Sequence, residues 1–249
     1  KVNYKTFESN EQMYSVLKQG GVSYDVIIPS DYMISRLIQE DKLEKLDFAN
    51  IPNFSDVDET FVKPAYDPTG EYSVPYMWGT VGIIYNTSMI SDKITSWSAL
   101  FDKKYAGQVL MIDNPRDAIG VALKELGYSY NTTDKNQIKE ATDLLIQQKK
   151  DGIVQAYVMD QIFDKMEREE AWIAPYYAGD YLTMAEENAS LAFSYPKEGF
   201  NIFIDAMCIP KGCQNKEGAE AFINFLCKPE ISGQNLEYLG YSTPETEAK

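Results

Sequence analysis

Apolar and polar positions follow two periods along the chain, and the two periods alternate. Around Met13, Val16 and Leu17 the apolar side chains recur at helical spacing, directly after a capping box formed by Ser9 and Gln12. The pattern predicts strands at 1–7, 26–28, 72–85, 109–112 and 202–209, and helices after Ser9, after Ser30, at 97–101, from Pro115, at 136–148 and at 219–226. Such alternation is typical of an α/β fold with a mainly parallel sheet.

Three predicted strands run into helices whose first turns carry acidic or aromatic side chains. The residues that share this position are Ser30, Asp31, Tyr32, Asn114, Asp117, Tyr176, Tyr177 and Asp180. A helix N-terminus ordinarily attracts an anion, so a carboxylate placed there indicates either a cationic ligand or no ligand. For each turn taken alone, helix capping or packing of paired aromatics is an adequate explanation. The recurrence of the pattern favours a binding site beyond the carboxyl ends of the strands.

Asp205 is the sharpest single signal, because it interrupts the apolar run FNIFIDAMCI at 200–209. A carboxylate in a buried strand must be paired, hydrogen-bonded or protonated. Two interpretations are open. Asp205 is either a structural residue satisfied by backbone N–H groups or a carboxylate that binds a cationic ligand.

Composition narrows the class of ligand. The 249 residues include 38 acidic and 23 basic side chains, for a net charge of −15, and 18 tyrosines. This charge argues against nucleic acid as a partner and favours an organic cation, which carboxylates and aromatic faces bind together. No apolar run approaches the length of a membrane helix and no signal sequence is present, so we expect an export signal that has been removed.

Histidine is absent from the sequence, which excludes Ser-His-Asp and Cys-His catalysis and the usual zinc sites. We predict no cofactor and no metal. The cysteines Cys208, Cys213 and Cys227 are too few for a disulfide framework. Buried free thiols are the favoured interpretation, and a Cys208–Cys213 disulfide is kept as the alternative.

Several short motifs resemble the polyamine (spermidine/putrescine) substrate-binding proteins of ABC importers. They are TFESNEQMY at 6–14, YDVIIPS at 24–30, SVPYMWG at 73–79, LGYS at 126–129 with NTTD at 131–134, PKEG at 196–199 and GYSTP at 240–244. Their order and spacing match that family over nearly the whole chain. The resemblance implies an α/β, two-lobed periplasmic-binding-protein-like fold with a ligand cleft between lobes. With crossing strands near Gly79 and at 203–205, we expect one lobe from 1–80 plus 204–249 and the other from 81–203.

The same resemblance implies a set of ligand-binding residues. They are Ser30, Tyr32, Asn114, Asp117, Tyr177, Phe203, Asp205 and Tyr241. Asp205 corresponds to the carboxylate that binds an ammonium group, and Asp117 to an acidic residue of the other lobe. Asn114 stands where relatives can have Asp, and Tyr177 and Phe203 where they can have Trp. These differences leave the preferred polyamine open.

The predicted function is capture of spermidine or putrescine without catalysis, followed by delivery to a membrane ABC permease. We expect an exported protein, periplasmic or lipid-anchored on the outer face of the cytoplasmic membrane. Relative to the family, the chain is expected to lack the first strand unit and a C-terminal segment, which are truncated, permuted or supplied by another chain. It should then bind polyamines weakly by itself, and should be a monomer unless another chain completes it. Two alternatives are a ferric-ion receptor using Tyr176 and Tyr177, and a carboxylate-pair glycoside hydrolase.

Overall fold

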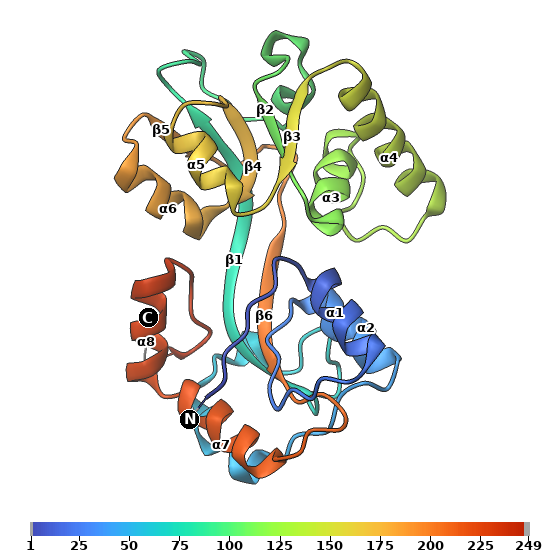
Figure 1. The fold of residues 1–249 in the computed structure, drawn as a ribbon, viewed down its shortest axis with the longest axis vertical. Coiled ribbons are helices and arrows are strands. Elements are labelled where there is room, and N and C mark those ends of the chain that lie inside the picture. The colour runs from blue at the N-terminus through green and yellow to red at the C-terminus, as the bar shows by residue number, and fades with distance from the viewer. Residues whose placement is uncertain (1, 247–249) are drawn as a thin grey trace. The chain divides into compact units, whose positions relative to one another are not determined.

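The computed structural model describes residues 2–246 and divides into two compact units (Figure 1). Unit 1 comprises Lys1–Gly79 and Phe203–Lys249, and unit 2 comprises Thr80–Ile202. The chain passes from unit 1 into unit 2 within strand β1 (Ser73–Asn86) and returns at the start of β6 (Ile202–Cys208). Each unit therefore has its own core and its own helices.

Unit 1 is built around β6 and the first half of β1. Its helices are α1 (Asn10–Gln19), α2 (Asp31–Gln39), α7 (Lys216–Leu226) and α8 (Pro229–Leu239). Successive side chains of a strand point to opposite faces. On β6, Ala206 and Cys208 accordingly pack into a cluster with α1 and α2, whereas Met207 packs into a second cluster with α7. The register of β6 thus fixes which of its side chains remain outside the core.

Unit 2 contains a sheet with the strand order β3-β2-β4-β1-β5. Its remaining strands are β2 (Val109–Ile112), β3 (Val154–Val158), β4 (Ile173–Tyr177) and β5 (Leu191–Ser194). Its helices are α3 (Pro115–Glu125), α4 (Lys135–Lys150), α5 (Gln161–Glu167) and α6 (Ala178–Glu187). Strand β2 is fully buried and pairs in parallel with β3 and β4, while β1 pairs antiparallel with β4 and β5.

The α/β class is confirmed, but the expectation of a mainly parallel sheet is wrong. The sheet is mixed because β1 lies between β4 and β5 and runs opposite to both. The predicted strand at 1–7 is absent among residues 2–7, and the one at 26–28 is reduced to an isolated bridge between Ile27 and Cys208.

The predicted helix at Trp97–Phe101 is a 3₁₀ helix. Further 3₁₀ helices among the described residues are Phe48–Asn50, Pro52–Asp56, Glu59–Phe61 and Lys103–Tyr105. All three cysteines are free thiols, so the Cys208–Cys213 disulfide that the sequence left open is not formed.

Candidate functional site

In unit 1, backbone pairing brings the N-terminus of α2 next to the middle of β6. The bridges Ile27–Cys208 and Ser30–Asp205 run antiparallel, and the Ala206 N–H donates to the Pro29 carbonyl at 3.1 Å. Ser30 is therefore adjacent to Asp205, although 175 residues separate them in sequence.

The Ser30 hydroxyl donates to Asp205 Oδ1 at 2.6 Å, and it makes no capping hydrogen bond to α2. Asn10 holds this serine from a second helix, because its Oδ1 accepts from the Ser30 N–H at 2.9 Å and its Nδ2 donates to Ser30 Oγ at 3.1 Å. Helix capping thus does not explain Ser30, whose side chain is committed to the carboxylate of Asp205.

The other polar residues of this turn extend the network. Asp31 accepts from the Tyr32 N–H at 2.5 Å and from the Ile204 N–H at 3.3 Å, which ties the first turn of α2 to β6 beside Asp205. The Tyr32 hydroxyl donates to Glu11 Oε1 at 3.0 Å. Glu11 Oε2 is buried and has no hydrogen-bond partner among the residues that the structure describes. Asn10 and Glu11 were not identified from the sequence, where only the flanking capping box was visible.

Two aromatic rings of the predicted site pack against one glycine of β1. Phe203 and Tyr241 make an edge contact with ring centroids 5.9 Å apart. A Cβ atom on Gly79 would lie 2.7 Å from Phe203 and 2.8 Å from Tyr241, so the two rings can occupy this position only over a glycine. Tyr241 is fixed in turn by the left-handed cap Gly240 and by backbone pairing of Ser242 with Trp78.

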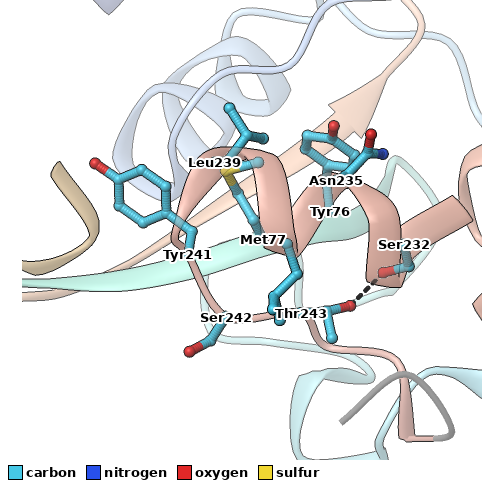
Figure 2. Close-up of a pocket in the computed structure, with 9 residues that line it drawn as sticks. Tyr76, Met77, Ser232, Asn235, Leu239, Tyr241, Ser242 and Thr243 are labelled. Carbon is cyan, nitrogen blue, oxygen red and sulfur yellow. Dashed lines mark hydrogen bonds between the residues drawn. The ribbon is translucent and has the colours of Figure 1, made fainter. Parts of the chain in front are cut away.

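Figure 2 shows a small pocket next to these aromatics, with Tyr241 at its edge and the Ser232–Thr243 hydrogen bond on its wall. Its volume of about 10 Å³ is at the lower limit for one water molecule. The pocket is therefore too small for an organic ligand, and of the predicted site residues only Tyr241 lines it.

In unit 2, Asn114 and Asp117 lie in the N-cap and first turn of α3, which follows the buried strand β2. Asn114 is the N-cap, and its Oδ1 accepts from the Arg116 N–H at 2.9 Å, while Pro115 opens the helix. Asp117 is only 3% exposed. The sequence-predicted helix start is confirmed here, and it positions both side chains.

Four uncharged donors surround the Asp117 carboxylate. Oδ1 accepts from the Tyr130 hydroxyl at 2.8 Å and from Asn201 Nδ2 at 3.0 Å. Oδ2 accepts from Asn114 Nδ2 and the Tyr177 hydroxyl, both at 3.1 Å. Burial raises the pKa of Asp117, and the hydrogen bonds from Tyr130, Asn201 and Tyr177 oppose that shift. Tyr130 and Asn201 were not identified from the sequence.

Tyr176 and Tyr177 end β4, and their rings are in contact, with centroids 4.8 Å apart. Tyr176 is 2% exposed, and the Tyr177 hydroxyl donates to Asp117 Oδ2 at 3.1 Å. Burial raises the pKa of both phenols, with the Asp117 charge as a further cause at Tyr177.

Two further properties hold for residues 2–246. They contain no group of three or more Asp, Glu, Cys or His side chains arranged to hold a metal ion. No helix in this range combines the length and the apolar character needed to cross a membrane.

The predicted site residues thus form contacts within each unit. Ser30 meets Asp205 and Phe203 meets Tyr241 in unit 1, while Asn114, Asp117 and Tyr177 form one network in unit 2. We call Ser30, Tyr32, Phe203, Asp205 and Tyr241 the unit 1 set, and Asn114, Asp117 and Tyr177 the unit 2 set.

Comparison with known proteins gives consistent results. Residues 23–249 match the family described as "Bacterial extracellular solute-binding protein". The spermidine/putrescine-binding periplasmic protein of Escherichia coli strain K12 is 35% identical over an alignment that covers the whole chain and 72% of the relative.

Among solved structures, a putative spermidine/putrescine ABC transporter from Listeria monocytogenes has a TM-score of 0.93 at 42% identity, covering 100% of this chain and 76% of that one. The Tp0655 (TpPotD) lipoprotein of Treponema pallidum has a TM-score of 0.86 at 30% identity, covering 96% and 77%. The chain belongs to the bacterial extracellular solute-binding protein family.

Proposed function

We propose that this protein is an extracytoplasmic receptor that captures a polyamine, spermidine or putrescine, and delivers it to an ABC permease. Family membership and the names of the relatives in Escherichia coli and Listeria monocytogenes support this function. The residues themselves supply the chemistry that such a ligand needs, in two separate groups of side chains.

The observation that carries the proposal is the Asp117 carboxylate. It is buried, its four hydrogen-bond donors are all uncharged, and it makes no ion pair with any described residue. A desolvated negative charge of this kind is stabilised by a cation, and leaving it unpaired costs several kcal/mol. An ammonium group of a polyamine supplies such a cation.

In this proposal each set of residues offers a carboxylate to an ammonium group of a polyamine. An ammonium group donates to Asp205 at the unit 1 set, and another donates to Asp117 at the unit 2 set. The rings of Phe203, Tyr241 and Tyr177 offer flat faces to the methylene chain, and a cation–π contact adds roughly 0.5–2 kcal/mol. Charge at both ends with apolar surface along the chain is the pattern of an α,ω-diamine.

We further propose that binding occurs without chemical conversion, as expected for a transport receptor, and that the protein acts as a monomer without nucleic-acid partners. Its proposed location is outside the cytoplasmic membrane, in the periplasm or on a lipid anchor. The Treponema pallidum relative carries the name lipoprotein, which supports the second arrangement.

Calorimetric titration of the full-length protein with putrescine, spermidine and spermine tests the function. We expect saturable binding of at least one of the three, and no visible absorption band on addition of ferric iron. Saturation by none of the amines would refute the proposal, and a purple phenolate–iron band would support the ferric-ion receptor instead.

A further inference from the structure

Two residues outside the unit 2 set donate to the Asp117 carboxylate, and both bind the same oxygen atom. Tyr130 and Asn201 both bind Oδ1, at 2.8 and 3.0 Å. They come from different parts of unit 2, 13 and 84 residues from Asp117 in sequence. Because both bind Oδ1, the other oxygen, Oδ2, is left to the donors of the unit 2 set, Asn114 and Tyr177.

Tyr130 is fixed in this position by its surroundings. Its side chain is 8% exposed, and its ring lies over Gly120, where a Cβ atom would come within 1.9 Å. The Arg116 guanidinium lies 5.1 Å from the ring centroid, donates to the Tyr130 carbonyl at 3.0 Å and binds Asn131 Oδ1. The hydroxyl therefore has little freedom to turn away from Asp117.

Asn201 is fixed through the backbone. Its carbonyl accepts from the Val81 N–H at 3.1 Å, which ties the residue to β1 directly before β6 begins. The side-chain amide is then directed to Asp117 from a segment of the chain that is itself paired with the sheet.

The donors on the other oxygen are of a different kind. Asn114 Nδ2 binds Asp117 Oδ2 at 3.1 Å and also donates to the Tyr177 hydroxyl at 3.2 Å. Because these two groups also bind each other, one of them can leave Oδ2 and keep a partner. A carboxylate has about four lone-pair directions, and all four are occupied here, so an incoming ammonium group must replace a donor. Replacement is easier at Oδ2 than at Oδ1.

We propose that Tyr130 and Asn201 are positioning residues, which anchor Oδ1 so that Oδ2 meets an ammonium group of the ligand. This inference rests on the proposed function, since it specifies how one carboxylate of the polyamine site is held. It assigns a role to two residues outside the predicted site.

The anchoring hydrogen bonds also stabilise the charged form of Asp117. Burial raises the pKa of Asp117, and hydrogen bonds from Tyr130, Asn201 and Tyr177 together with the nearby Arg116 charge lower it. Removing the Tyr130 hydroxyl therefore raises the pKa further. Since an ammonium group binds the ionised carboxylate, affinity should then begin to fall at a higher pH on acidification.

The test compares Tyr130→Phe and Asn201→Leu with the wild-type protein in spermidine titrations over a range of pH. The matched control is Tyr128→Phe, which removes a hydroxyl that binds the exposed Glu140 at 2.6 Å. We expect Tyr130→Phe and Asn201→Leu to weaken binding by roughly tenfold at neutral pH, and to move the acidic decline in affinity to higher pH. Tyr128→Phe should match the wild type in both respects.

Circular dichroism checks folding, and if one positioning variant does not fold, the other decides the result. Wild-type affinity and an unshifted pH profile in a folded Tyr130→Phe or Asn201→Leu variant would overturn this inference alone. Weaker binding with an unshifted profile would also overturn it, since a purely structural role predicts that result. Absence of polyamine binding by the wild-type protein would overturn the proposed function, and this inference with it.

Discussion

Asp205 in unit 1 and Asp117 in unit 2 are two carboxylates with the same proposed task and different surroundings. Asp205 is partly buried on a strand, and backbone register places it beside the Ser30 hydroxyl. Asp117 lies in the first turn of a helix, almost fully buried, within a network of four neutral donors. One carboxylate is positioned by strand pairing and the other by a side-chain network.

This difference in surroundings predicts which properties a substitution at each carboxylate should change. Burial disfavours a charged carboxylate, and hydrogen bonds restore it only when their geometry is maintained. Changes around Asp117 should therefore alter stability and pH dependence as well as binding. Changes at Asp205 should alter mainly binding.

The largest expected effect is on binding by Asp205→Asn. This substitution keeps the shape of the side chain and removes its charge, so the ammonium group at the unit 1 set loses its partner. We expect spermidine affinity to fall by roughly 2–5 kcal/mol in free energy, as for other desolvated charge pairs, with little change in the melting temperature. A variant that melts early and still binds normally would show that Asp205 is structural.

Glu245 is another buried carboxyl, with fewer hydrogen-bond donors around it than Asp117. Glu245 of unit 1 is 2% exposed and its Oε2 has no hydrogen-bond partner among the described residues. Burial, with the nearby Asp56 charge, raises the pKa of Glu245 from 4.5 to about 7, although a hydrogen bond with the Cys227 thiol opposes the shift. Because the folded-state pKa lies above the unfolded one, ionisation destabilises the fold progressively as pH rises from about 4.5 to about 7.

Glu245→Gln should therefore match the wild type near pH 4 and be more stable at pH 8. The pKa difference sets an upper limit of about 3 kcal/mol on this gain. Urea unfolding at both pH values measures it, with the exposed Glu237→Gln as the matched control. Equal stability of Glu245→Gln and the wild type at pH 8 would contradict the raised pKa of this buried carboxyl.

The Asp117 network predicts a loss of stability for Asp117→Asn. An amide oxygen has two lone pairs where the carboxylate has about four, so at least two of the four donors lose their acceptor. We expect a decrease of roughly 2–3 kcal/mol in the free energy of unfolding, because buried unpaired donors cost about 1–3 kcal/mol each and relief of the buried charge offsets part of this. Denaturant unfolding of Asp117→Asn and Asp205→Asn under the same conditions provides the measurement. An equal loss of stability in the two variants would contradict the proposed difference between the two carboxylates.

The smallest expected effects come from two helical glycines. Gly120 in α3 faces the Tyr130 ring at a distance that excludes a Cβ atom, whereas a Cβ atom on Gly233 in α8 would meet no neighbouring atom within 4 Å. Glycine-to-alanine substitution in a helix ordinarily stabilises by about 0.5–1 kcal/mol. We expect that gain for Gly233→Ala, and a loss of roughly 1–3 kcal/mol for Gly120→Ala from overpacking, both measured by thermal unfolding. A stabilised Gly120→Ala variant would show that Tyr130 can move.

Local patterns in the sequence predicted the elements that depend on local interactions. The fully apolar run at 109–112 forms β2 with the predicted bounds, and Asn114 with Pro115 starts α3 where capping preferences place it. The strand at 154–158 was missed because Gln155 and Tyr157 are partly or fully exposed and break the apolar pattern. The orientation of β1 in the sheet could not be predicted, because strand order depends on pairing between distant segments.

The same limit applies to the candidate site. Asp205 was noticeable because an acidic residue interrupts an apolar run, and Ser30 because it precedes a helix. The hydrogen bond between Ser30 and Asp205 depends on a backbone bridge between segments 175 residues apart. Tyr130 has no local signal of its own, since its partner Gly120 lies in the preceding helix and resembles an ordinary helical glycine. Residues that act through tertiary hydrogen bonds cannot be recognised from periodicity.

The central claim is the proposal that Asp117 and Asp205 are partners for the ammonium groups of a polyamine. The most direct measurement compares calorimetric titrations of the full-length protein with putrescine and with butylamine, which has the same four-carbon chain and a single ammonium group. We expect putrescine to bind at least roughly a hundredfold more tightly, because loss of one ammonium group leaves a desolvated carboxylate unpaired. Equal affinity for the two amines would contradict the claim.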